Sequence, residues 1–171
     1  MLAKTLFLPL LAVVAVVLFG MGAEAAEWVL LEYGILREHI SVPELSTFAK
    51  TGELSSSLRA HLKMANQKPD DLRRVLIKEI EVDPIKLSKV LNSLPGEILL
   101  DQVSKVMRTP TDRASRESLR GAIITSALAD GNIRLIEVLE NYPTPVVHVE
   151  GDRLVEIYNS INSVLGNFPK F

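Results

Sequence analysis

The chain has 171 residues, a formal net charge of −2 and only 5% aromatic residues. A near-neutral charge and few aromatic rings give no basis for nucleic-acid binding, which uses basic surfaces and base-stacking platforms. The absence of cysteine from the sequence excludes disulfides, thiol catalysis and thiolate metal ligands. The length fits one domain, which must be stabilised by its apolar core.

Residues 1–25 have the layout of a secretory signal peptide. Lys4 supplies the positive charge, Leu6 to Phe19 is almost entirely apolar, and Ala23-Glu24-Ala25 is a small-residue processing site. We expect cleavage to leave residues 26–171 as a single exported domain, in the periplasm or the thylakoid lumen. The alternative is an uncleaved membrane anchor, because the apolar run can be extended to about 18 residues, the lower limit for a membrane span.

The mature chain begins with a strand pattern and continues with helix patterns. Trp28 to Tyr33 is rich in β-branched and aromatic residues, Gly34 interrupts it, and Ile35 to Val42 resumes the extended pattern, which predicts a hairpin. Capping residues, first-turn prolines and apolar stripes then predict short helices, and one further strand follows. The helices are expected from Ser41 or Pro43 to Ala49, over Ser55–Ala65, from Pro69, over Ile85–Leu91, from Pro95, over Arg116–Ala129 and Ile133–Leu139, and after Asp152; the strand is expected at Val146–Val149.

The segment from Arg116 to Ala129 is the expected centre of the domain. Its apolar and small residues cover most of a helix surface, and only Arg116, Glu117 and Arg120 in its first turns are charged. A helix that is apolar nearly all round is typically buried among other helices. Asp130-Gly131 is expected to end it, because both residues tolerate left-handed backbone geometry. The predicted fold class is mainly α: a compact multi-helix domain around a buried central helix, with a minor β element made of the N-terminal hairpin and short strands.

Two further expectations concern the segments between helices. Thr109 to Ala114 is polar and contains Pro110, so we expect an exposed, mobile loop there. Three valine-bearing stretches run from an extended segment into a capped helix, at His39–Leu45, Ile80–Leu87 and Val147–Leu154. We expect these corners to pair in one small sheet beside the helices.

The sequence contains no recognisable reaction centre. It lacks a Gly-x-Ser-x-Gly string, which forms the nucleophile elbow of α/β-hydrolases. Ser41, Ser55 and Ser115 stand where helix caps are expected. We therefore expect no catalytic residue.

Metal sites are not indicated either. The histidines show no metal-binding spacing, although His39 and His148 fall on expected strands and would be neighbours if those strands paired. Glu79, Glu81 and Asp83 alternate, but a solvated face with a helix cap explains them better than a calcium site, which needs more oxygens and a defined loop. We expect neither a metal nor a cofactor.

Four arginines on and before the central helix form the one candidate contact site: Arg108, Arg113, Arg116 and Arg120. The last three are three and four residues apart and align on one face if the helix begins early. Positive charge at a helix start opposes the helix dipole unless an anion is near. Two explanations stay open: carboxylates of this chain, such as Asp112 or Glu117, or an anionic group or acidic patch of a partner, whose oxygens the arginine fork matches.

Several short strings, in the same order, resemble a known family. They are L-S-T-F-A-K-T-G at Leu45–Gly52, I-E-V-D-P-I-K-L-S-K-V-L at Ile80–Leu91, L-R-G-A-I-I-T-S-A-L-A at Leu119–Ala129 and V-L-E-N-Y-P at Val138–Pro143. The family is domain of unknown function 1400, a helical segment that precedes an α/β-hydrolase domain in cyanobacterial proteins, usually behind a signal peptide. The resemblance spans most of the mature chain, about Ala26 to Leu165. None of these strings is catalytic, and the sequence ends where the relatives' hydrolase domain would begin, so the resemblance implies association with a hydrolase but no activity of these residues.

Three functional hypotheses follow. The first is an exported, non-catalytic helical module that binds a protein partner or an apolar ligand between its helices. The second is an accessory or regulatory domain of a separately encoded α/β-hydrolase. The third is an esterase whose site has no recognisable motif. A membrane partner is expected only if the N-terminal segment stays uncleaved.

Overall fold

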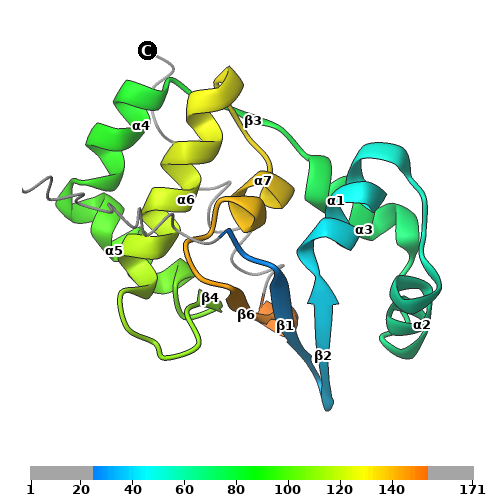
Figure 1. Cartoon of the computed structure of the whole chain (residues 1–171). Helices are drawn as coiled ribbons and strands as arrows, with labels where there is room; N and C mark the ends of the chain where they lie inside the picture. The colour runs from blue at the N-terminus through cyan, green and yellow to red at the C-terminus, as the bar shows by residue number, and fades with distance from the viewer. Residues whose placement is uncertain (1–24, 154–171) are drawn as a thin grey trace, which may run out of the picture.

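The computed structural model describes residues 25–153 (Figure 1). The expected signal peptide and all but the start of the helix expected after Asp152 lie outside the described residues. Within them the elements follow in the order β1 (Trp28–Tyr33), β2 (Leu36–Ser41), α1 (Val42–Thr51), α2 (Ser56–Met64), α3 (Pro69–Ile77), β3 (Ile80–Glu81), α4 (Pro84–Leu91), α5 (Leu94–Val103), β4 (Met107–Arg108), α6 (Ser115–Asp130), β5 (Asn132–Ile133), α7 (Leu135–Glu140) and β6 (Val146–Glu150).

The predicted N-terminal hairpin is confirmed. β1 and β2 are antiparallel, with Trp28 opposite Ser41 and Tyr33 opposite Leu36. The two-residue turn between them begins at Gly34, whose φ of +57° is a left-handed conformation that glycine adopts without strain.

A four-stranded sheet forms around this hairpin, in the order β2-β1-β6-β4. β6 runs parallel to β1, with Val147 opposite Val29, and β4 is antiparallel to β6. β3 and β5 form a separate two-stranded sheet. The expectation of a single sheet joining the three valine corners is therefore wrong: Val42 is already the first residue of α1, and β3 finds its partner in β5 rather than in the larger sheet.

The helices form two groups joined by α7. Figure 1 shows α4, α5 and α6 together and α1, α2 and α3 together, with α7 between the groups and the larger sheet below them; α7 contacts α1, α3 and α6. On the sheet, Val29, Ile40, Val147 and Val149 are buried, as alternation along a strand requires when one face packs on the core. The mainly helical class is confirmed, but the β part is a full structural layer rather than a minor element.

The expected burial of the central helix is only partly correct. α6 is the longest described helix and contacts α4, α5, α7, β4 and β5. Its buried residues Leu119, Ala122 and Ser126 follow one helical stripe. Leu128 lies on another face and is 67% exposed, so α6 is packed on one side and open on the other. Its predicted end is confirmed, because Gly131 caps it with φ +76°.

Helix starts follow the predicted capping chemistry in most places. Ser41 accepts from the backbone N–H of Glu44, and Ser55 accepts from that of Leu58. The cap expected at Ser115 is wrong, because Ala114 holds the cap position with φ +54° and Ser115 is the first helical residue. The apolar residues Val75 on α3 and Ile98 on α5 are 45% and 55% exposed.

The loop before α6 is more tightly held than expected. Thr109 is buried, its backbone N–H donates to Ser115 Oγ at 3.1 Å, and its hydroxyl donates to the carbonyl of Arg113 at 2.8 Å. Within the segment from Thr109 to Ser115, only residues 110 to 114 are exposed.

One guanidinium links the helix groups to the small sheet. Arg134 precedes α7 and contacts Glu79 at 2.6 Å, Asp130 at 2.9 Å and Glu137 at 2.5 Å. These hydrogen bonds raise the pKa of Arg134, with the bond to Glu79 contributing most. In the described part of the chain, no helix has the length and apolar character needed to cross a bilayer.

Candidate functional site

The four candidate arginines do not form one row. Arg113 lies in the loop, outside α6, so the early helix start that would align it with Arg116 does not occur. Arg108 is on β4, where it contacts Asp112 at 3.0 Å and Glu150 at 4.0 Å. Only Arg116 and Arg120 share a helix face.

Arg116 and Arg120 face two acids on α5. Arg116 lies 3.4 Å from Asp101 and 3.9 Å from Glu97, and Arg120 lies 3.3 Å from Glu97. Each pair is four residues apart on its own helix, so the charges match in spacing. A third contact of Arg116, to Glu117 at 3.3 Å, raises the pKa of Arg116 most strongly among its neighbours. Carboxylates of the chain itself therefore occupy both guanidinium groups.

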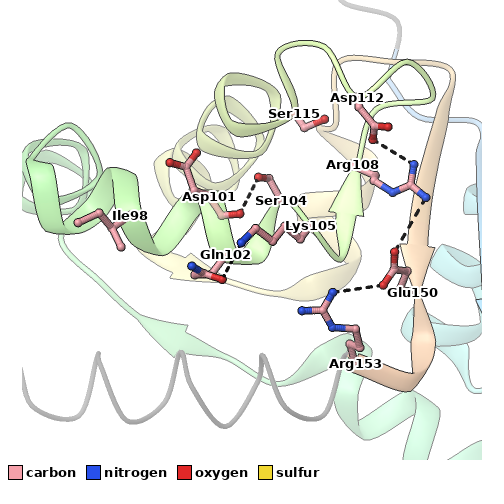
Figure 2. A pocket seen from close by; sticks show the side chains of 10 residues that line it. All are labelled: Ile98, Asp101, Gln102, Ser104, Lys105, Arg108, Asp112, Ser115, Glu150 and Arg153. Atoms are coloured by element: carbon pink, nitrogen blue, oxygen red, sulfur yellow. Dashed lines mark hydrogen bonds and ion pairs between the residues drawn. The ribbon is translucent and has the colours of Figure 1, made fainter.

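An open depression of about 750 Å³ lies where α5, β4 and the end of β6 meet (Figure 2). It is lined by Ile98, Asp101, Gln102, Ser104, Lys105, Arg108, Asp112, Ser115, Glu150 and Arg153. Three of these side chains are cationic and three are anionic, so the depression has no net formal charge. Figure 2 shows Arg108 between Asp112 and Glu150, and Arg153 reaching the same glutamate. Such a surface offers paired charges to a partner rather than an isolated anion-binding pocket.

Serines and carboxylates meet at two places away from this depression. Ser46 donates to Glu140 at 2.5 Å. On the other side of α1, Ser55 and Ser57 both donate to Glu44. Burial raises the pKa of Glu44, but the two serine hydrogen bonds and the charge of nearby His61 outweigh it, so the pKa is lowered.

None of the described histidines accepts a hydrogen bond from a serine. His61 Nδ1 lies 3.5 Å from Glu38, without hydrogen-bond geometry. His39 and His148 would be direct neighbours only if their strands paired, and these strands do not pair. β1 lies between them, and both histidines stand opposite Leu30. Desolvation, with the charge of Arg108, lowers the pKa of His148. A serine activated by a histidine needs the imidazole within hydrogen-bond reach, and the described residues do not bring such a serine–histidine pair together.

The acidic residues between α3 and α4 have separate partners. Glu79 contacts Arg134, and Asp83 caps α4 by accepting from the backbone N–H of Lys86 at 2.9 Å. Across residues 25–153, no three side chains of the metal-ligating types His, Cys, Asp or Glu gather around a common point.

A second hollow, of about 430 Å³, lies at the start of the fold. It is lined by Ala25, Ala26, Val42, Pro43, Ser46 and Glu140. No local sequence pattern indicates it, because Glu140 and Ala26 are far apart in the chain. Two of the carboxylates suggested from the sequence do contact the candidate arginines, Asp112 with Arg108 and Glu117 with Arg116. The partners that lie far away in the chain, Glu97, Asp101 and Glu150, were missed, although the four-residue spacing of Glu97 and Asp101 was a usable signal.

Comparison with known proteins gives one family. Residues 25–150 match the family described as alpha/beta hydrolase of unknown function (DUF1400). No curated protein and no solved structure matches the chain. The matched range begins just before β1 and ends with the last residue of β6, so it includes every helix and strand described above.

Proposed function

This chain belongs to the DUF1400 family of α/β-hydrolases of unknown function, and from that premise we propose that it is an exported, non-catalytic module that binds an α/β-hydrolase catalytic domain and regulates it. The observation that carries the proposal is the dispersal of its reactive side chains. Described serines cap helices or donate to Glu44 and Glu140 on separate surfaces, and none of these serines is hydrogen-bonded to a described histidine.

The sheet also differs from the architecture that α/β-hydrolase chemistry uses. That chemistry places a serine on a sharp turn from a strand into a helix, within a Gly-x-Ser-x-Gly string. The sequence has no such string, and the described sheet contains a single parallel pair, β1 with β6. Family membership therefore favours an association with hydrolase activity. The geometry of the site favours an accessory rather than a catalytic role in that activity.

A protein partner is favoured over an apolar ligand. Sites for small apolar molecules are concave and mostly apolar, whereas the depression beside Arg108 is open and lined by charges of both signs. Complementary charges of this kind orient two protein surfaces. We propose the depression, with Lys105 at its rim, as the contact surface.

The test uses the full chain and a separately expressed α/β-hydrolase catalytic domain from another family member. Hydrolysis of p-nitrophenyl butyrate is measured for each alone and for the mixture. We expect no turnover by the chain alone and an altered kcat/KM of the catalytic domain in the mixture. The variant Lys105→Glu should weaken the effect at least several-fold, because a rim charge governs complementarity.

Arg59→Glu, a charge reversal on an exposed position of α2, is the matched control and should leave the effect unchanged. Turnover by the chain alone would favour the esterase hypothesis instead. An unaltered kcat/KM in the mixture, with no binding by calorimetry, would refute the accessory role. Export is tested separately: N-terminal sequencing of the secreted protein should begin at Ala26.

A further inference from the structure

The backbone at the start of the fold is fixed on both sides. The N–H groups of Glu27 and Trp28 both donate to the carbonyl of Pro145, at 2.9 and 3.0 Å, and the N–H of Val42 donates to the carbonyl of Glu27 at 2.9 Å. Ala26, immediately before these anchors, is only 4% exposed. Ala26 as a whole residue therefore has a defined and largely buried position while Ala25 is still attached to it.

The hollow next to Ala26 is mostly apolar and contains one carboxylate, that of Glu140. Glu140 is the last residue of α7, where a negative charge is disfavoured by the helix dipole and gains from additional cations. Its present partners are Ser46, at 2.5 Å, and Lys50, at 3.3 Å, and the side chain of Lys50 is 68% exposed. An exposed lysine stabilises a carboxylate only weakly, so Glu140 can accept a second cation.

We propose that this hollow is the binding site for the new N-terminus of the processed chain, with the α-ammonium group of Ala26 paired to Glu140. The inference rests on the export part of the proposed function. A leader-removing peptidase hydrolyses the Ala25–Ala26 peptide bond: water provides the hydroxyl of the new Ala25 carboxyl group and a hydrogen for the nitrogen of Ala26. That amine is largely protonated at neutral pH, because an α-amino group has a pKa of about 7.7–8.0.

Burial makes a charge at Ala26 depend on a counter-ion. Ala26 is buried in the unprocessed chain, and a charge created at a position that stays shielded from water is destabilising unless it is paired. Glu140 is the carboxylate that lines the same hollow. Processing thereby adds an electrostatic anchor to the backbone hydrogen bonds that already hold residues 27 and 28.

The experiment compares two exported forms of the full precursor. One is the natural sequence; the other carries Gly-Ser inserted between Ala25 and Ala26, which keeps the Ala23–Ala25 processing signal but moves the ammonium group two residues away. Both are made with and without Glu140→Gln. We expect the insertion and E140Q each to lower the unfolding midpoint by a few degrees, and the insertion to have no further effect when E140Q is present.

A second readout is the pKa of the Ala26 amine, measured by NMR on the exported protein. A carboxylate partner favours the charged ammonium, whereas burial without such a partner disfavours it, so the pKa should be higher in the natural form than in E140Q. Lys50→Met, which removes the other cation from the same carboxylate, is the matched control and should leave the amine pKa raised.

Three results would overturn the inference: a secreted chain that does not begin at Ala26, an amine pKa that is the same in the natural form and in E140Q, or an insertion effect that persists in E140Q. None of these measurements involves the hydrolase domain. Failure here and failure of the accessory role are therefore separately visible.

Discussion

Arg134 forms ion pairs with three carboxylates. Its guanidinium is bound by Glu79, Asp130 and Glu137, which come from three different segments. The side chain itself is 21% exposed, so these hydrogen bonds are only partly screened by water. A single residue thus holds the start of α7 against the end of α6 and the segment before β3.

Replacing Arg134 with methionine should lower the free energy of unfolding by about 1–2 kcal/mol, because several charge-assisted hydrogen bonds are lost while their acidic partners stay close together. Arg134→Lys keeps the charge but not the planar fork and should recover only part of the loss. Urea denaturation measures both. Arg74→Met removes an exposed pair with Asp71 and should change stability by less than about 0.5 kcal/mol; an equal loss there would contradict the argument.

His148 gives the fold a defined dependence on pH. Burial and the charge of Arg108 lower its pKa below 6.5. The unfolded chain therefore binds this proton at higher pH than the folded chain, so stability is complete above about pH 6.5 and falls on acidification below it.

The variant His148→Gln should reduce the loss of unfolding free energy between about pH 7 and pH 5.5, because the differential proton binding disappears. Urea titrations at the two pH values measure it. Arg108→Met should reduce the slope partially, since it removes one of the two causes. An unchanged slope in the glutamine variant would place the pH dependence on other groups.

Among the elements, the corner between α4 and α5 depends on a glycine. A Cβ atom on Gly96 would lie 2.0 Å from the carbonyl oxygen of Val90 and 2.8 Å from the Cα of Leu91. Both are backbone atoms, so the two helices would have to separate.

Gly96→Ala should therefore lower the free energy of unfolding by about 2–3 kcal/mol or more, as overpacking does. Gly121→Ala is the matched control, because it makes the same change within α6, where a Cβ meets nothing within 4 Å. It should stabilise the protein by up to about 1 kcal/mol through helix propensity. Thermal unfolding of the two variants gives the comparison, and similar shifts for both would contradict it.

Helix ends could be predicted from the sequence because their chemistry is local. The cap bonds of Ser41 and Ser55 reach three residues along the chain, and the left-handed glycines Gly52 and Gly131 follow directly on the helices that they end. Strand partners could not be predicted, since pairing depends on the whole path of the chain. The pattern of Val146–Val149 indicates a strand, but nothing in it specifies β1 as the neighbour.

The same distinction between local and long-range features holds for the candidate site. Arg108, Arg116 and Arg120 stand out because charge is unexpected beside an apolar helix. Their partners Glu97 and Glu150 belong to segments that only the tertiary fold brings near. Arg113 would align with Arg116 and Arg120 only if the helix began before it, and α6 begins at Ser115.

At the scale of the whole molecule, the larger sheet ties the first strand to the last. β1 lies between β2 and β6, and Val147 on β6 is completely buried opposite Val29. Pairing of β1 with β6 therefore encloses nearly the entire described chain between the two strands, and we expect sheet and helices to unfold together.

Trp28, the only tryptophan, is in β1 and reports on the sheet, while far-ultraviolet circular dichroism reports on the helices. The two unfolding curves should coincide. Val147→Ala should shift both by the same amount, with a loss of about 2 kcal/mol from the buried methyl groups. Fluorescence that changes before the helix signal would show that the sheet is a separate folding unit.

The parallel arrangement of β1 and β6 has a mechanical consequence. The described chain begins just before β1, and it leaves β6 at the opposite end of the sheet, where the N–H of Gly34 donates to the carboxylate of Asp152 at 2.7 Å. Tension applied between Ala25 and Arg153 pulls these adjacent strands along their length in opposite directions. The ladder hydrogen bonds then resist as a group in shear instead of opening one after another, so a force spectrometer pulling through these two points should record a higher rupture force than one pulling across the Tyr33–Leu36 hairpin end.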